Sequence, residues 1–222
     1  MAWQPAYHHC VPAPNDDVLE LWRRVVNCRV EEIEEWHTTP ASSSVGTRAP
    51  GARWSVGQLA GIRTAELLAV PVAEWTAADH AHVRRVAGFV RRHRAQWPRG
   101  DVRERRWRHA LRNWGHDPLW EGRLTLSALD GQGQVLVDGE PVGTLSTSAE
   151  DALVLHSLVL EESWRGRGVG SAVLHQLAVD HDGRVRAELD PTPGAADVRA
   201  LLVRRHFDAP TPDSSVLTLV GW

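Results

Sequence analysis

The sequence predicts an α+β fold in which an all-α N-terminal domain precedes a domain of strands and helices. Two observations predict this organisation. In the second half of the chain a strand-like segment, a glycine-rich loop and a helical segment follow one another directly, with further strand-like segments on either side. In the first half, apolar residues recur at helical spacing and the composition differs. The chain therefore divides into two parts of different secondary structure.

Charge and tryptophan content place the division near residue 120. The protein has 222 residues, and all 25 of its Lys and Arg residues are arginines. Residues 1–120 carry 17 Arg against 13 Asp and Glu, whereas residues 121–222 carry 8 against 15. Nine of the 11 tryptophans lie in the first part. We therefore expect a tail over residues 1–14, a helical Arg- and Trp-rich domain over 15–120 and a second domain over 121–222.

The stretch from Leu153 to Asp180 carries the strongest functional signal. Val and Leu fill most of residues 153–160, which is typical of a strand, and the loop Arg165-Gly166-Arg167-Gly168-Val169-Gly170 follows. Apolar residues then recur at helical spacing, at Val169, Val173, Leu174 and Leu177. The first N–H groups of a helix lack intrahelical partners, and glycine lets the chain approach a ligand closely. The pattern therefore predicts an anion-binding site.

The spacing Arg165-x-x-Gly168-x-Gly170, after a strand that ends at Leu160, resembles the pyrophosphate-binding motif of the GCN5-related N-acetyltransferase (GNAT) family. The resemblance covers about residues 123–222 and implies a mixed central sheet with flanking helices. It also implies acetyl-coenzyme A (acetyl-CoA) as cosubstrate, its pantetheine arm paired with the motif strand and its pyrophosphate held by loop amides. The implied cofactor-binding residues are Leu158, Val159, Leu160, Arg165, Gly166, Arg167, Gly168, Val169, Gly170 and Ser171.

The segments around the motif agree with the order of elements in that family. A strand is expected over residues 124–129, and Asp138-Gly139-Glu140-Pro141 separates two further strand-like segments, which predicts a hairpin. After the motif we expect a strand over 184–190, a helix over 197–206 and a strand over 215–220.

Two residues are candidates for the base that takes a proton from an attacking amine. Glu188 lies on the strand after the motif helix, near where the resembled ribosomal-protein acetyltransferases carry a catalytic glutamate. His156 lies on the motif strand in the same parity as Leu158 and Leu160, and an unperturbed histidine titrates at about pH 6.5. For each residue a structural or surface role is an equally open interpretation.

Two features depart from the family pattern. Leu202 stands where a tyrosine general acid commonly lies, and the only tyrosine of the chain is Tyr7. Water or His206 would then protonate the leaving thiolate. In addition, the strand from Leu124 is followed almost directly by the hairpin, which leaves no room for the two helices that usually wall the acceptor site. The helical N-terminal domain is a candidate for that wall.

The N-terminal domain is predicted to consist of helices. Asn15-Asp16-Asp17 are expected to cap a first helix, residues 30–37 form a second, and a loop covers residues 39–54. Ser55 is expected to cap a third helix. Thr76-Ala77-Ala78-Asp79 has the shape of a capping box and opens the longest helix, which extends to about Gln96.

A basic stretch begins on this long helix. From Arg84 to Arg112 there are 11 Arg against Asp101 and Glu104, and Arg84, Arg85, Arg91 and Arg92 lie opposite the apolar face of the helix. A face this basic is suited to follow a nucleic acid backbone. The other interpretation, which we favour, is that arginine serves as the general surface cation of a chain without lysine.

A second resemblance covers about residues 16–119. The segment Asn113-Trp114-Gly115-His116-Asp117-Pro118-Leu119 resembles that of an uncharacterised helical family, some of whose members are labelled DNA-binding. This resemblance implies no activity. In physical terms we expect a helix-ending turn at the solvent edge, because Gly115 tolerates a positive φ and Pro118 prevents further helix. A functional role for His116 and Asp117 is the alternative.

The remaining composition limits the class of protein. Cys10 and Cys28 have no metal-ligand spacing, so we predict neither a metal site nor a disulfide. No apolar run reaches about 18 residues, and we expect a cytoplasmic protein without a membrane partner. We therefore predict an acyl-CoA-dependent N-acyltransferase that transfers an acetyl group from acetyl-CoA to an amine. The alternative is a nucleic-acid-binding regulator in which a degenerate GNAT domain senses coenzyme A or acts as a scaffold.

Overall fold

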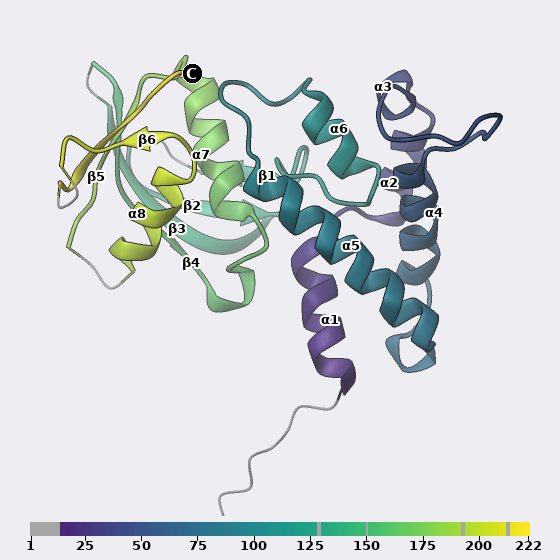
Figure 1. Ribbon diagram of the computed structural model, residues 1–222. Coiled ribbons are helices and arrows are strands. Elements are labelled where there is room, and N and C mark those ends of the chain that lie inside the picture. Colours follow the sequence, from purple (N-terminus) through teal and green to yellow (C-terminus); the bar gives the residue numbers. More distant parts are fainter. Residues whose placement is uncertain (1–13, 128–129, 150, 192–193, 212–213) are drawn as a thin grey trace, which may run out of the picture.

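The computed structural model describes residues 14–222 except 128–129, 150, 192–193 and 212–213. Two parts lie side by side: the first half of the chain forms a group of helices, and the second half forms a sheet with its own helices (Figure 1). The helices of the first part end at Arg112, and the first strand begins at Leu124. Residues 1–13 of the predicted tail, which include Cys10, lie outside the described residues.

Six α-helices and one 3-10 helix make up the described first part. They are α1 (Pro14–Val25), α2 (Val30–His37), α3 (Pro40–Ser43), α4 (Val56–Leu68), η1 (Val72–Glu74), α5 (Ala77–Ala95) and α6 (Arg106–Arg112). The apolar sides of α1, α4, α5 and α6 share one core that includes Trp22, Val83, Val86, Val90 and Leu111. The predicted apolar face of the long helix is thus the face that α5 buries.

Side-chain caps fix where two of these helices begin. The Ser55 hydroxyl accepts from the Gln58 N–H at 3.2 Å, and the Gln58 side chain accepts from the Ser55 N–H at 3.0 Å. At the start of α5, the Thr76 N–H donates to the Asp79 carboxylate at 2.8 Å, and the Asp79 N–H donates back to the Thr76 hydroxyl at 3.3 Å. The helix starts predicted at Ser55 and Thr76 are confirmed.

Other helix boundaries differ from the prediction. Helix α1 begins at Pro14, so Asn15-Asp16-Asp17 lie inside its first turn rather than before it. The predicted loop contains α3, which starts with Pro40 behind the cap Thr39. The helix-ending turn expected after residue 112 does follow helix α6, but neither the start nor the length of this helix was predicted. Both missed helices are at most seven residues long, too short for an apolar period to show.

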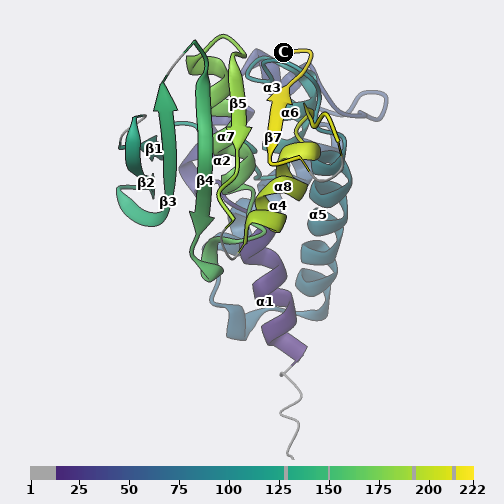
Figure 2. The same ribbon diagram turned by 90° about the vertical axis from the view of Figure 1, so that its left-hand side faces the viewer.

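The second part is built on a seven-stranded sheet in the order β1-β2-β3-β4-β5-β7-β6 (Figure 2). Its strands are β1 (Leu124–Leu126), β2 (Gly131–Val137), β3 (Glu140–Ala149), β4 (Leu153–Leu160), β5 (Val185–Glu188), β6 (Phe207–Asp208) and β7 (Val216–Leu219). Only β4 and β5 pair in parallel. Antiparallel pairs join the other neighbours, so the sheet is mixed, as expected.

The predicted hairpin forms between β2 and β3. Asp138 has a φ of 54° and Gly139 a φ of 82°. Two successive residues with positive φ make the tight turn whose twist matches that of the flanking strands, and Asp-Gly is a favoured pair for it. Glu140 then pairs with Val137 directly across the turn.

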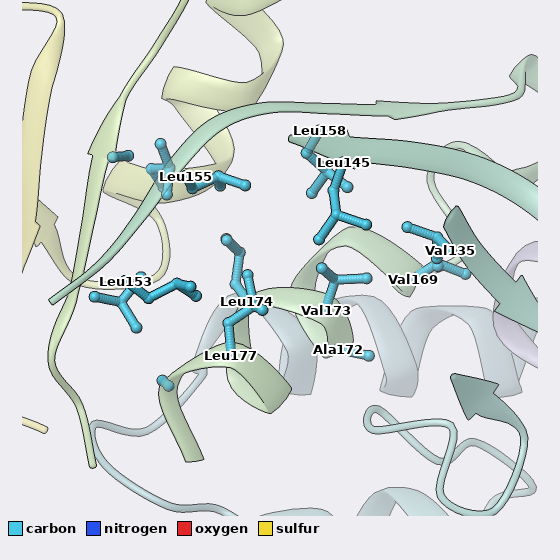
Figure 3. Packing of buried hydrophobic residues seen from close by; sticks show 14 of the residues in the cluster. Val135, Leu145, Leu153, Leu155, Leu158, Val169, Ala172, Val173, Leu174 and Leu177 are labelled. Atoms are coloured by element: carbon cyan, nitrogen blue, oxygen red, sulfur yellow. The ribbon is translucent and has the colours of Figure 1, made fainter. Parts of the chain in front are cut away.

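One face of the sheet packs against helix α7 (Val169–Asp180), as Figure 3 shows. Val169, Val173 and Leu177 from the helix and Leu145 and Leu155 from the strands are buried in the same cluster. Helix α8 (Ala195–Val203) joins this cluster through Leu202. Burial of each large side chain of this kind stabilises the fold by about 1.5–3 kcal/mol.

The N-terminal helices pack beside α7, which lies between them and the sheet (Figure 1). The loop after α5 contacts α7 where the Val102 N–H donates to the His175 ring at 3.1 Å. On the opposite face of the sheet, side chains such as Gln134, Thr144 and Thr218 are exposed. The helical domain therefore does not cover that face. We expected this domain to wall the acceptor site, and it can do so only on the side of the sheet where α7 lies.

Candidate functional site

A cavity of about 380 Å³ lies where β4 ends, beside the glycine loop and the first turn of α7. Strand β4 lines it with residues 156–160, and the loop lines it with Arg165, Gly166 and Gly168. Asp197, Val198, Ala200 and Leu201 of α8 form another side. The cavity thus joins the three consecutive elements that the sequence singled out.

The cavity opens because two parallel strands separate. Pairing of β4 with β5 stops at Leu155 and Ala187. One further backbone bond, from the Asp190 N–H to the His156 carbonyl at 3.1 Å, links the two chains beyond this point. Residues 158–160 then line the cavity along the edge that β5 would otherwise occupy, while β3 pairs with their other edge. An extended ligand can pair with such an edge through main-chain hydrogen bonds.

The glycine loop offers unused N–H groups to this cavity. In the part of the chain that the structure describes, the amides of residues 166–170 donate to no acceptor. The Ser171 N–H, in contrast, donates to the Gly168 carbonyl at 3.0 Å and is already engaged. Gly168 has a φ of 103°, a conformation that side chains rarely adopt. Free amides at the start of a 12-residue helix favour a bound anion.

Gly170 is required for a different reason, because α7 and α8 approach each other closely there. A Cβ atom at this position would lie 2.9 Å from Cδ2 of Leu201. It would also lie within 4 Å of side-chain atoms of Leu158 and Leu160. The third glycine of the motif therefore brings α8 and β4 together around the cavity.

Four arginines line the cavity: Arg94, Arg165, Arg204 and Arg205. Arg165 donates from Nε to the Leu160 carbonyl at 3.0 Å. Arg94, which comes from α5 of the first part, donates from Nη1 to the Gly166 carbonyl at 3.0 Å. Burial, followed by the neighbouring Arg91, lowers the pKa of Arg94 to about 10. Burial also lowers the pKa of Arg205 to about 10, and the positive charge of Arg94 adds to that effect.

The structure brings together eight of the ten residues predicted to bind the cofactor. These eight line the cavity: Leu158, Val159, Leu160, Arg165, Gly166, Gly168, Gly170 and Ser171. The side chain of Arg167 lies elsewhere, with its guanidinium 4.9 Å from the centre of the Trp164 ring. Val169 is fully buried in the core and does not line the cavity.

The two candidate bases lie in different places. His156 lines the cavity, whereas Glu188 does not and instead pairs with Nε of Arg186 at 3.1 Å. The ring of His156 contacts the Ser148 hydroxyl at 2.9 Å and the Glu188 carbonyl at 3.3 Å. Because a carbonyl only accepts, this arrangement places the proton of the neutral ring on Nδ1 and leaves Nε2 to accept from Ser148.

The predicted parity of His156 with Leu158 is broken by an irregularity in β4. Ser146 pairs with Ser157, but the next residue of β3, Thr147, pairs with Leu155. His156 is therefore the extra residue of a bulge, and Leu155 and Leu158 both belong to the buried cluster. Alternation counted along a regular strand does not apply across this point.

Leu202, which stands in place of the usual tyrosine, and His206, considered as the general acid, both lie outside the cavity. Leu202 is buried in the core of the second part. His206 has a φ of 67°, and its ring contacts the Trp97 carbonyl at 3.0 Å. Neither lines the cavity. Of the two sources considered for the proton of the leaving thiolate, the geometry therefore favours water.

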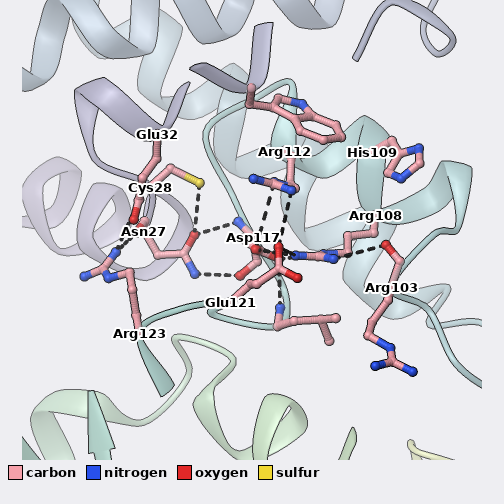
Figure 4. Close-up of polar contacts among 12 residues, drawn as sticks. Asn27, Cys28, Glu32, Arg103, Arg108, His109, Arg112, Asp117, Glu121 and Arg123 are labelled. Carbon is pink, nitrogen blue, oxygen red and sulfur yellow. Dashed lines mark hydrogen bonds and ion pairs between the residues drawn. The ribbon is translucent and has the colours of Figure 1, made fainter. Parts of the chain in front are cut away.

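The segment Asn113–Leu119 is buried, so the expected solvent-edge turn is wrong. The Asp117 carboxylate accepts from Arg108 Nε at 2.9 Å and Nη2 at 2.7 Å, and Arg108 also binds Glu121 (Figure 4). Burial alone would raise the pKa of Asp117, but the hydrogen bonds from Arg108 hold it below its usual value. Gly115 does take the expected positive φ of 82°. The segment is therefore a buried, hydrogen-bonded part of the helical domain.

Within the described residues, no group of three or more His, Cys, Asp or Glu residues is arranged to hold a metal ion. No helix in that part is both long and apolar enough to span a membrane.

Two family models match the chain, and their ranges overlap at residues 89–112. The model of the acetyltransferase (GNAT) family matches residues 89–190, and the model of a protein of unknown function (DUF3140) matches residues 21–112. Both ranges include Arg94. No curated protein and no solved structure matches the chain. The chain therefore contains a GNAT acetyltransferase domain match at residues 89–190 and an N-terminal match to the uncharacterised DUF3140 family at residues 21–112.

Proposed function

We propose that the protein is an N-acetyltransferase that transfers the acetyl group of acetyl-CoA to an amine. One observation carries the proposal: a single cavity joins the free amides of the glycine loop to the unpaired edge of β4. A diphosphate needs the first feature, and an extended amide-containing arm needs the second. Both belong to the domain that matches the GNAT family.

The cosubstrate would bind along this line of groups. The amides of residues 166–170 would receive the pyrophosphate, and the main chain of residues 158–160 would pair with the pantetheine arm. The thioester would then lie toward residues 156–157, at the bulge of β4. Backbone N–H groups at such a position can polarise the thioester carbonyl as negative charge develops on its oxygen.

His156 is the better placed of the two proposed bases. An amine attacks the thioester carbonyl only in its neutral form, so one proton must leave it during the reaction. Nε2 of His156 accepts a hydrogen bond from Ser148 and could receive that proton directly or through the hydroxyl. Glu188 remains the second proposed base. Its carboxylate does not line the cavity, so a proton would have to leave the cavity to reach it.

Any acceptor amine other than the N-terminus of the chain lies outside it. The sequence contains no lysine, so none of its own side chains offers an amine. A cytoplasmic location, which the cysteine usage favours, is part of the proposal. The alternative of a nucleic-acid-binding regulator has lost part of its support, because Arg94 lines the cavity and Arg108 is buried with Asp117.

Release of free thiol tests the proposed reaction. The full-length protein would be incubated with acetyl-CoA and a panel of amines, from small primary amines to peptides with free N-termini. We expect at least one amine to release thiol faster than the amine-free control, together with an acetylated product found by mass spectrometry. Binding of acetyl-CoA without turnover by any amine class would instead support the coenzyme A sensor.

A further inference from the structure

The helical domain places one charged side chain in the cavity of the acetyltransferase domain. Arg94 lies at the end of α5, and its guanidinium touches both glycines of the loop that adopt a positive φ. It donates to the Gly166 carbonyl at 3.0 Å, and a Cβ atom on Gly168 would lie 3.2 Å from its Nη2. The same loop holds the free amides of residues 166–170. Arg94 and these amides therefore border one space.

This charge has no anionic partner in the described residues. Asp190 and Asp197 also line the cavity, but neither forms an ion pair with an arginine in the part of the chain that the structure describes. Arg205 adds a second positive charge, with its guanidinium 4.4 Å from the centre of the Trp97 ring. Nε of Arg205 is buried and has no acceptor among these residues. Buried charges and donors that lack partners are costly unless something else satisfies them.

The buried arginine Arg108 has a different environment from the half-buried Arg94. Arg108 is paired with Asp117 at 2.7 Å and Glu121 at 2.8 Å, and these carboxylates raise its pKa against the opposing effect of burial. The pKa of Arg94 is lowered instead, because burial and Arg91 act without a carboxylate to offset them. A pair of partly buried cations beside free amides is the arrangement expected of a site whose anion is a ligand.

We propose that Arg94 of the helical part of the chain binds the diphosphate of the cosubstrate, so that helix α5 completes the cofactor site beside the glycine loop. This inference rests on the function proposed above. The planar guanidinium would donate to phosphate oxygens from one side while the loop amides donate from the other. The helical domain is then a necessary part of the binding site and not only its neighbour.

Substitution of Arg94 by glutamine tests this role in the full-length protein. Glutamine keeps an N–H donor for the Gly166 carbonyl but removes the charge. Arg84→Gln is the matched control, because Arg84 lies exposed on the same helix. Each protein would be titrated by calorimetry with acetyl-CoA and with S-acetylpantetheine, which lacks phosphate. We expect Arg94→Gln to raise the Kd for acetyl-CoA by about tenfold to a hundredfold, as for loss of a charged hydrogen bond. Its Kd for S-acetylpantetheine and the binding by Arg84→Gln should match wild type.

Three results would overturn the inference in distinguishable ways. If Arg94→Gln binds acetyl-CoA as tightly as wild type, Arg94 does not contact the diphosphate and the proposed function is untouched. If it weakens both ligands equally, Arg94 only holds the loop in shape. If wild type binds neither ligand, the proposed function fails as well. A second variant, Arg94→Lys, keeps the positive charge and covers the case in which the glutamine variant misfolds. It should bind acetyl-CoA more tightly than Arg94→Gln does. An equally raised Kd for acetyl-CoA in both variants would contradict a charge contact.

Discussion

The backbone N–H of Val102 donates to Nε2 of His175 at 3.1 Å, and this bond joins the loop after α5 to the middle of α7. The ring of His175 also contacts Trp97 and Trp222, at 6.3 Å and 5.5 Å between ring centres. An accepting Nε2 requires the neutral ring. Burial lowers the pKa of His175 from 6.5 to about 4, and the nearby Asp101 carboxylate only partly opposes this effect. The junction between the two domains therefore depends on an uncharged histidine.

This dependence predicts that stability falls in acid. Between about pH 6.5 and pH 4 the unfolded chain protonates His175 while the folded chain does not, so stability is lost as the pH falls through this window. The loss approaches about 3 kcal/mol, at about 1.36 kcal/mol per pKa unit. His175→Gln keeps an acceptor for Val102 but cannot titrate. Urea unfolding at pH 7.5 and pH 5 should show a smaller pH difference in this variant, and an unchanged difference would exclude His175 as the source.

The Arg108–Asp117 pair should be a major source of stability in the helical domain. Arg108→Met removes the cation and leaves the Asp117 carboxylate buried, which we expect to lower the free energy of unfolding by about 3–5 kcal/mol. Glu20→Gln breaks the exposed pair with Arg24 and should cost less than about 1 kcal/mol. Chemical denaturation measures both. Equal small effects would show that the buried pair contributes little.

His156 should affect turnover more than cosubstrate binding. If it is the base, His156→Ala lowers kcat by about 10² to 10⁴ and leaves the affinity for acetyl-CoA nearly unchanged. Glu188→Gln should have the smaller effect, because its carboxylate faces Arg186 and does not line the cavity. Steady-state kinetics with the best amine decides between them. A larger loss in Glu188→Gln would reverse the assignment, and full activity in both would leave an already neutral amine as the nucleophile.

The exposed arginines of α5 should not form a strong nucleic acid site. Arg84, Arg85, Arg91 and Arg92 remain on its surface after Arg94 and Arg108 are accounted for. Each phosphate neutralised on a duplex contributes about −0.9 to the slope of log K against log salt. We expect no gel-shift complex at micromolar protein and about 50 mM salt, where non-specific binders usually register. A sequence-specific complex that survives physiological salt and disappears on charge reversal of these four residues would support the regulator.

Local patterns predicted the elements that position the candidate site. Strand β4 covers the expected residues 153–160, and α7 begins within the glycine motif, because both have long apolar patterns bounded by clear breaks. The bulge at His156 was not predictable, since it depends on how β3 pairs with β4. Arg94 was missed for a related reason. It stood out only as one of many arginines, and the contact that distinguishes it spans 72 residues of sequence.

The burial of Asp117 shows the same limit in the helical domain. Its Gly115 and Pro118 neighbours correctly predicted a turn, but a turn can be exposed or buried. Whether the turn is exposed or buried depends on the residues that pack against it. Asn27, which is 90 residues away in the sequence, accepts a hydrogen bond from the Asp117 N–H. Local rules give the backbone conformation there, whereas the environment of the turn follows from tertiary packing.

A titration with acetyl-CoA tests the central claim most directly. The full-length protein would be studied by calorimetry and by thermal unfolding over a range of acetyl-CoA concentrations. The proposed site predicts measurable binding heat and a melting temperature that rises with ligand, because a ligand at about 100 times its Kd adds about 2.7 kcal/mol to the free energy of unfolding. Neither heat nor a thermal shift at millimolar acetyl-CoA would contradict the assignment of the cavity between β4 and α7 as a cofactor site.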